Sequence, residues 1–339
     1  MKIHYFQRYH QKENVATANT MLLLSRLYQH SADGFFELLK EMFSNSFEPE
    51  IIFNLQEKNA DSVPDATITQ QSFKIVVETK TSDSFYSDQL LRHLNSFTDE
   101  KYKVLMTLAP ELMNEETKGQ FENELKKHND VQRYPVMHIN TTFEQLANAV
   151  QNVISDGDYV MQEVLNDYFS YCYEDHLIPV NDTWKYMRVL PVGATFDFNV
   201  TNNLYYAPAD RSFRPHDYLG LYTGKSVRAV GKIIARITTV KQNGEMIYET
   251  EFGELTELRK KEIENAIATS KNYGYDLSSS EYKFRYFFVE KFHDTDFKKT
   301  TKYPLRGPRV FDLTQVLETN TIPNSVEEIA NILKEKIWQ

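Results

Sequence analysis

The sequence predicts an α/β protein of two domains, an α/β/α core followed by a smaller α+β domain of barrel type. The chain has 339 residues, which is long enough for two domains. Helix-like and strand-like segments alternate up to about residue 154, whereas short strands with few helices follow residue 180, a pattern typical of small barrels. The predicted parts are a first domain over residues 1–156, a bridging helix over 157–179 and a second domain over 180–339.

Periodicity places the elements of the first domain. Apolar residues recur at helical spacing between residues 9 and 28, and short apolar runs bounded by polar turns indicate strands. The predicted helices cover residues 9–28, 34–43, 87–97, 115–128 and 142–154, and the predicted strands cover residues 50–56, 65–69, 73–79, 102–108 and 134–139. Because only residues 70–72 separate two of these strands, we expect strands 65–69 and 73–79 to form an antiparallel hairpin.

Charged residues lie at the ends of the two strands of this hairpin. Asp65 follows Pro64, and Glu78 and Lys80 close the apolar run that begins at Phe73. Side chains alternate along a strand, so Glu78 and Lys80 point the same way, and the hairpin would bring Asp65 beside Glu78. Two carboxylates suit Mg²⁺, which prefers carboxylate and water oxygens. A neighbouring lysine can orient an attacking water while the metal stabilises charge on a phosphate.

Pro64-Asp65 followed by Glu78-Thr79-Lys80 resembles the PD-(D/E)XK signature of the restriction-endonuclease-like nucleases. A Glu-x-Lys alone is common as a solvated strand end, so the resemblance depends on the order of helices and strands over residues 9–154. It implies an α/β/α nuclease core that hydrolyses DNA phosphodiester bonds with Mg²⁺, for which Mn²⁺ substitutes. It also implies that Asp65 and Glu78 bind the metal and that Lys80 is catalytic.

Two further residues match positions that this superfamily uses. Members often carry a glutamate on the helix before the core sheet, where Glu13 lies, so Glu13 would be an additional metal ligand. The alternative is that the helix dipole alone favours Glu13 in the first turn. Gln89 and His93 lie four residues apart on one helix face and resemble the Q-x-x-x-Y element of the RecB-like branch, with His in place of Tyr. Gln89 would then line the catalytic site; the alternative is a solvated glutamine.

The second domain interleaves basic and aromatic residues, a combination that suits phosphate contacts and base stacking. The candidate binding residues are Arg211, Arg214, Lys225, Arg228, Tyr206 and Tyr222. Residues 217–222 followed by 227–233 resemble PUA-like modules of the ASCH and EVE group, which hold a nucleobase or nucleotide in an aromatic pocket. The resemblance implies a domain that recognises a target, a modified base or a nucleotide ligand. The alternative is that the tyrosines fill the domain core and the charges are solvated.

Charge and composition limit the partners and the compartment. The net charge is −10, but residues 1–179 carry 15 Lys and Arg against 27 Asp and Glu, whereas the remainder carries 23 against 21. The second domain is therefore better placed to bind nucleic acid. The single cysteine, Cys172, excludes an intramolecular disulfide and favours a reducing, cytoplasmic setting. No apolar run approaches the roughly 18 residues of a membrane span, and the first residues lack the pattern of a signal peptide.

The leading hypothesis is therefore a Mg²⁺-dependent endonuclease that cuts DNA in restriction or anti-phage defence. A homodimer is expected, because many nucleases of this type cut both strands as dimers. Two alternatives stay open: a nuclease switched by a nucleotide bound to the second domain, and a catalytically inert nucleic-acid-binding protein on the same fold.

Overall fold

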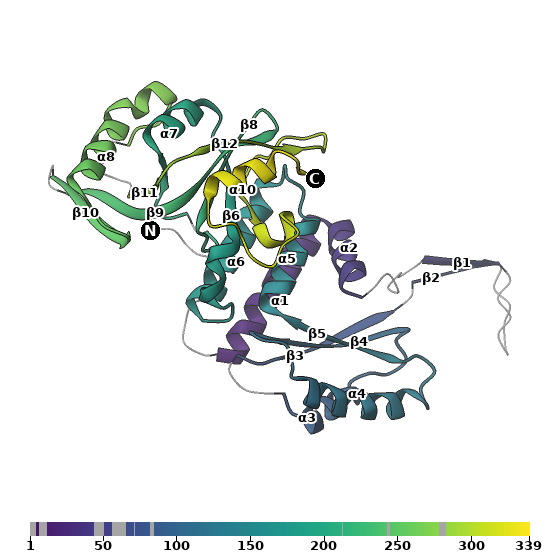
Figure 1. Cartoon of the computed structure of the whole chain (residues 1–339). Helices are drawn as coiled ribbons and strands as arrows, with labels where there is room; N and C mark the ends of the chain where they lie inside the picture. The colour runs from purple at the N-terminus through teal and green to yellow at the C-terminus, as the bar shows by residue number, and fades with distance from the viewer. Residues whose placement is uncertain are drawn as a thin grey trace. The chain divides into compact units, whose positions relative to one another are not determined.

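The computed structural model describes residues 5–6, 12–43, 51–55, 66–70, 72–81, 85–211, 213–242, 245–277 and 283–339. The chain divides into two compact units. The N-terminal unit comprises Phe6–Ile154 and Tyr171–Pro179, and the C-terminal unit comprises Met1–Tyr5, Ser155–Ser170 and Val180–Gln339. The predicted bridging helix corresponds to α6 (Tyr159–Glu174), which contributes residues to both units. Both units combine helices with sheets, so the predicted α/β class is confirmed (Figure 1).

The N-terminal unit contains five helices and five strands among the described residues. In chain order they are α1 (Lys12–His30), α2 (Ala32–Met42), β1 (Ile51–Leu55), β2 (Ala66–Gln70), β3 (Phe73–Thr79), α3 (Ser87–Leu94), β4 (Tyr102–Ala109), α4 (Glu115–Asn129), β5 (Val136–Thr142) and α5 (Phe143–Val153). Strands β3, β4 and β5 form a parallel sheet in that order, and β1 pairs with β2 in a separate antiparallel ribbon.

The predicted hairpin between residues 65–69 and 73–79 is wrong for the described residues. Strand β2 pairs with β1, and β3 pairs in parallel with β4, which places Glu78 opposite Thr107. The reason lies in β4, which is buried from Val104 to Ala109 and therefore needs a strand on each side and a helix on each face. The route by which the hairpin would have brought Asp65 beside Glu78 is absent, and Asp65 itself lies outside the described residues.

Helices cover both faces of the β3–β4–β5 sheet (Figure 1). On one face Ile75 and Val77 of β3 pack in the cluster that contains Leu39 of α2. On the other face, Val76 packs in the cluster that contains Leu90 of α3 and Phe121 of α4. Because side chains alternate along a strand, Glu78 shares the face of Val76 and points toward α3.

The C-terminal unit is built on one mixed sheet with helices against it. Beyond its part of α6, its strands are β6 (Tyr186–Pro191), β7 (Leu204–Pro208), β8 (Tyr218–Thr223), β9 (Ser226–Gln242), β10 (Glu245–Phe252), β11 (Phe284–Val289), β12 (His293–Lys299), β13 (Arg309–Asp312) and β14 (Ile337–Trp338). Its helices are α7 (Phe196–Asn202), α8 (Glu257–Thr269), α9 (Leu313–Val316) and α10 (Val326–Leu333), with short 3₁₀ turns at Val180–Lys185, Gly193–Thr195 and Ser270–Tyr273.

The 17-residue strand β9 organises this sheet. Its first half pairs with β8 and β12, and its second half pairs with β10 and β11. The path runs β13-β6-β8-β9-β11-β7, and no pairing among the described strands joins β13 to β7. The sheet therefore does not close on itself in the described part of the chain, and the predicted barrel type is not confirmed. In the same part of the chain, no helix combines the length and the apolar character that crossing a bilayer requires.

Two glycines with positive φ, one crowded and one in open space, allow the geometry of the β9–β10 pair to be tested. Gly253 follows β10 with φ +72°, and a Cβ there would collide with the carbonyl oxygen of Ile234. Gly274 has φ +82° with open space around it. Gly274→Ala should cost about 1 kcal/mol, the price of the left-handed conformation, and Gly253→Ala should cost clearly more because a clash is added. Urea unfolding of the full chain measures both, and equal losses would contradict the β9–β10 geometry.

Candidate functional site

Glu78 is the centre of a cluster of polar side chains at the end of β3. Its side chain is 13% exposed. Oε1 accepts a hydrogen bond from Gln89 Nε2 at 2.6 Å and lies 3.1 Å from Lys80 Nζ, while Oε2 lies 2.9 Å from His93 Nε2. An ionised carboxylate can only accept, so Nε2 of His93 carries a proton in this contact. Three donors, Lys80 just after β3 and Gln89 and His93 of α3, therefore hold one carboxylate in place.

Lys80 is placed by an extension of the β3–β4 ladder. Its backbone N–H donates to the carbonyl oxygen of Leu108 at 2.9 Å, so the chain stays extended and Lys80 shares the side of Glu78. The Lys80 side chain is 10% exposed, and its Nζ also lies 3.6 Å from Oε2 of Glu13. Burial alone would lower the pKa of Lys80, but the hydrogen bond and charge of Glu78, together with Glu13, raise that pKa above its usual value. Lys80 is therefore an ammonium at neutral pH.

Glu13 reaches the cluster from the first turn of α1. Its side chain is 39% exposed, so it is the more accessible of the two carboxylates that border the Lys80 ammonium. The position in the first turn is also the one that the helix dipole favours, so the two explanations given for Glu13 are compatible.

Gln89 and His93 lie one turn apart on α3, and both contact the Glu78 carboxylate. The structure therefore brings four predicted site residues together, Glu13, Glu78, Lys80 and Gln89. The contact of His93 with Glu78 was not anticipated. The signal for it was present in the sequence, since a residue four positions after Gln89 shares its helix face.

The donor chemistry of this cluster is compatible with a hard divalent cation. Mg²⁺ is commonly held by one or two carboxylates and keeps several waters, and Glu13 and Glu78 supply two carboxylates beside one ammonium. Oε2 of Glu78 accepts one hydrogen bond and retains a second lone pair. The described ranges contain no group of three or more His, Cys, Asp or Glu arranged as a metal site. A third carboxylate would have to come from elsewhere, and Asp65 stays a prediction.

Two of the predicted binding residues of the C-terminal unit are packed inside it. Arg214 is 2% exposed, and its guanidinium carbon lies 3.7 Å from the ring centre of Tyr186 and 4.6 Å from that of Phe169. Tyr222 is buried, and its hydroxyl accepts a hydrogen bond from the backbone N–H of Leu305. Tyr222 therefore agrees with the alternative in which the tyrosines fill the core, whereas Arg214 is buried and is neither a solvated charge nor an accessible binding residue.

The other four predicted binding residues fall in different places. Tyr206 and Arg211 line one cavity of about 370 Å³, which also includes Tyr205 and Tyr275. Lys225 is exposed in the turn between β8 and β9, with φ +60°. Arg228 forms an ion pair with Asp296 at 2.9 Å. The structure therefore groups Tyr206 with Arg211 at one cavity, whose lining includes neither Lys225 nor Arg228.

Comparisons with family models, with curated proteins and with solved structures found no match to this chain. Function is therefore inferred from the short motif and from the geometry of its side chains.

A buried histidine two strands from Glu78 predicts a pH dependence of stability. Burial, and then the charge of Lys118, lower the pKa of His138 in β5 to about 4. The nearest carboxylate, Glu122, is half-exposed and lies 4.0 Å from Nδ1 of His138. The unfolded chain binds a proton near pH 6.5, so stability should fall as pH drops from about 6.5 toward 4, by about 1–3 kcal/mol.

His138→Gln removes this titration and serves as the comparison. The difference in unfolding free energy between the two proteins should shift in favour of the variant as the solution is acidified from pH 7 to pH 4.5. Parallel pH profiles of urea unfolding would contradict a neutral, buried His138.

Proposed function

We propose that the N-terminal unit is a Mg²⁺-dependent endonuclease that hydrolyses DNA phosphodiester bonds. The observation that carries the proposal is the contact of the Lys80 ammonium with two carboxylates, at 3.1 Å from Glu78 and 3.6 Å from Glu13, at the end of a strand in a parallel sheet. The Glu-x-Lys part of the nuclease signature implies a carboxylate and an ammonium that converge, and Glu78 and Lys80 are in contact.

Each residue of the cluster would have its own role in hydrolysis. Glu78 and Glu13, with Asp65, would hold the metal ion, which when bound lowers the pKa of a water and stabilises charge on the phosphate. Lys80, which stays protonated, would orient the attacking water and donate to the phosphate oxygen on which charge develops. Gln89 and His93 would keep the Glu78 carboxylate in one orientation through their hydrogen bonds to its two oxygens.

The fold supports this assignment at a coarser level. A parallel sheet covered by helices on both faces, with the element order α1 to α5, is compatible with a restriction-endonuclease-like core. We extend the proposal to a PUA-like C-terminal unit that selects the target. Restriction or anti-phage defence, a homodimer and a cytoplasmic setting complete the proposal. The defence role follows from the pairing of the two proposed domains, the homodimer from the nuclease resemblance, and the cytoplasmic setting from the single cysteine, Cys172.

Substitutions at Lys80 and Glu78 test the proposal. Lys80→Met and Glu78→Gln should each reduce Mg²⁺-dependent cleavage of plasmid DNA by about 100-fold or more, because each removes a charge that acts on the reacting phosphate or its metal. Lys74→Met is the matched control. Lys74 lies on the same strand and the same face, but its side chain is 43% exposed and its Nζ donates to the Ser96 carbonyl oxygen. Cleavage by Lys74→Met should equal that of the wild type.

Circular dichroism establishes that each variant is folded before its activity is interpreted. Folded Lys80→Met and Glu78→Gln proteins that cleave at the wild-type rate would overturn the proposal. A wild-type protein that cleaves neither DNA nor RNA with Mg²⁺ or Mn²⁺ would favour the inert nucleic-acid-binding alternative.

A further inference from the structure

Arg188, in the middle of β6, is a buried cation without a balancing charge. It is 4% exposed, and its Nε has no hydrogen-bond partner among the described residues. Its guanidinium carbon lies 5.2 Å from the ring centre of Phe213. Burial lowers the pKa of Arg188 to about 10, the hydroxyl of Tyr205 opposes that shift, and Arg211 and Arg285 add to it. The described neighbours that act on its charge therefore include no carboxylate.

Four other cations of the same unit are paired with carboxylates. Arg236 and Arg285 both pair with Glu251 at 2.7 Å, and Lys299 and Arg309 both pair with Asp156 at 2.7 and 3.0 Å. Burying an unpaired charge is costly, so a bound anion would be stabilised beside a buried guanidinium such as that of Arg188.

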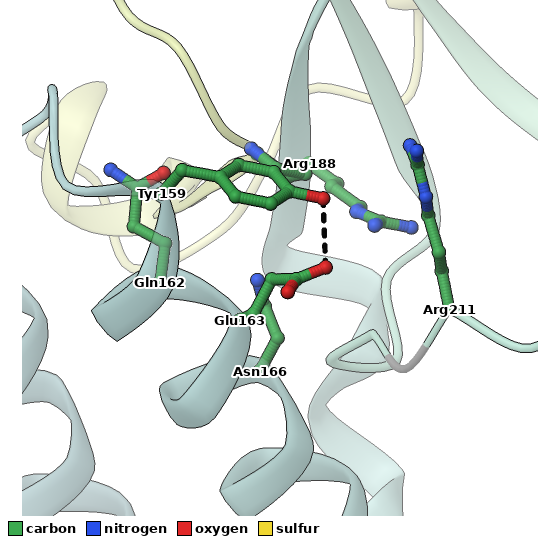
Figure 2. A pocket seen from close by; sticks show the side chains of 7 residues that line it. Tyr159, Gln162, Glu163, Asn166, Arg188 and Arg211 are labelled. Carbon is green, nitrogen blue, oxygen red and sulfur yellow. Dashed lines mark hydrogen bonds between the residues drawn. The ribbon is translucent and has the colours of Figure 1, made fainter. Parts of the chain in front are cut away.

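Arg188 and Arg211 line the same small cavity against α6 (Figure 2). Figure 2 shows Arg188 extending toward Arg211, with Tyr159 and Glu163 on the α6 side. Glu163 is the one carboxylate among the described lining residues, and it accepts a hydrogen bond from the Tyr159 hydroxyl at 2.7 Å. No ion pair joins Glu163 to either arginine in the described part of the chain. Two guanidinium groups therefore border a space that a small anion could enter.

Arg211 also lines the cavity of about 370 Å³, a size that suits a small organic ligand. Tyr205, Tyr206 and Tyr275 contribute aromatic surface to it. Asn199 adds a buried acceptor: it is 1% exposed, its Nδ2 donates to the Leu204 carbonyl oxygen, and its Oδ1 has no partner among the described residues. An aromatic heterocycle with an N–H donor would satisfy both features of this cavity.

We propose that the C-terminal unit binds a mononucleotide-sized phosphate, with the phosphate between Arg188 and Arg211 and the base in the tyrosine-lined cavity beside Asn199. Paired guanidinium forks match the oxygens of a phosphate. Aromatic faces stack on a nucleobase, and the unpartnered Oδ1 of Asn199 accepts from its edge. This site is independent of the proposed nuclease centre and does not require that centre to be active. The same chemistry fits a free mononucleotide or the phosphorylated end of a nucleic acid strand.

Isothermal titration calorimetry tests the site, with the full chain carrying Lys80→Met so that no substrate is cut. The probes are the four ribonucleoside 5′-monophosphates, the matching nucleosides, inorganic phosphate and a short 5′-phosphorylated oligonucleotide. At least one monophosphate should bind, and Arg188→Met and Arg211→Met should each weaken it tenfold or more. Arg228→Met, whose partner is Asp296, is the control and should leave binding unchanged.

A second measurement separates binding from folding. Without ligand, Arg188→Met should melt at or above the wild-type temperature, because it removes a buried charge that lacks a partner, and millimolar phosphate should stabilise only the protein that keeps Arg188. If the oligonucleotide binds more tightly than the monophosphate, the ligand is the phosphorylated end of a strand. If the monophosphate binds more tightly, the ligand is a free nucleotide.

Three results would overturn the proposal. The first is that neither phosphate nor any monophosphate binds at millimolar concentration. The second is that a nucleoside binds as tightly as its monophosphate. The third is that Arg188→Met without ligand melts at a much lower temperature than the wild type. Since cleavage is not measured, failure of the nuclease proposal would leave these results unaffected.

Discussion

Lys80 and Glu78 can share the end of β3 because each offsets the charge of the other. Their side chains are 10% and 13% exposed, so either one alone would be a buried, unpaired charge. The contact requires the parallel β3–β4 ladder that extends to Lys80 and the α3 helix that supplies Gln89 and His93. The helices and strands of the N-terminal unit therefore hold the Glu78 carboxylate against the Lys80 ammonium, which also contacts the more exposed Glu13.

The same constraint distinguishes two kinds of buried charge in the C-terminal unit. Glu251 and Asp156 each form ion pairs with two cations. The charges of these clusters are therefore balanced by residues of the chain itself. Arg188 has comparable burial and no such anion in the described residues. Structural charge clusters and candidate ligand sites can thus be separated by asking whether the chain itself supplies the opposite charge.

Local patterns predicted much of this arrangement from sequence, and nonlocal pairing limited the rest. Strand periodicity placed Glu78 and Lys80 on one side, and helix periodicity placed Gln89 and His93 on one face. The predicted hairpin of residues 65–69 and 73–79 was wrong because the pairing partner of a strand depends on the whole sheet. Arg214 and Tyr222 were chosen for residue type, which does not reveal burial, and Arg188 was missed because it lies within an apolar strand that reads as core.

The most direct test of the central claim is thermal unfolding with and without divalent metal. If Glu78 helps to hold a cation, Mg²⁺ or Mn²⁺ should raise the melting temperature of the wild type, by the equivalent of about 2.7 kcal/mol at a hundredfold excess over Kd. The same additions should leave Glu78→Gln nearly unchanged. A wild-type melting temperature that neither metal alters would contradict the account.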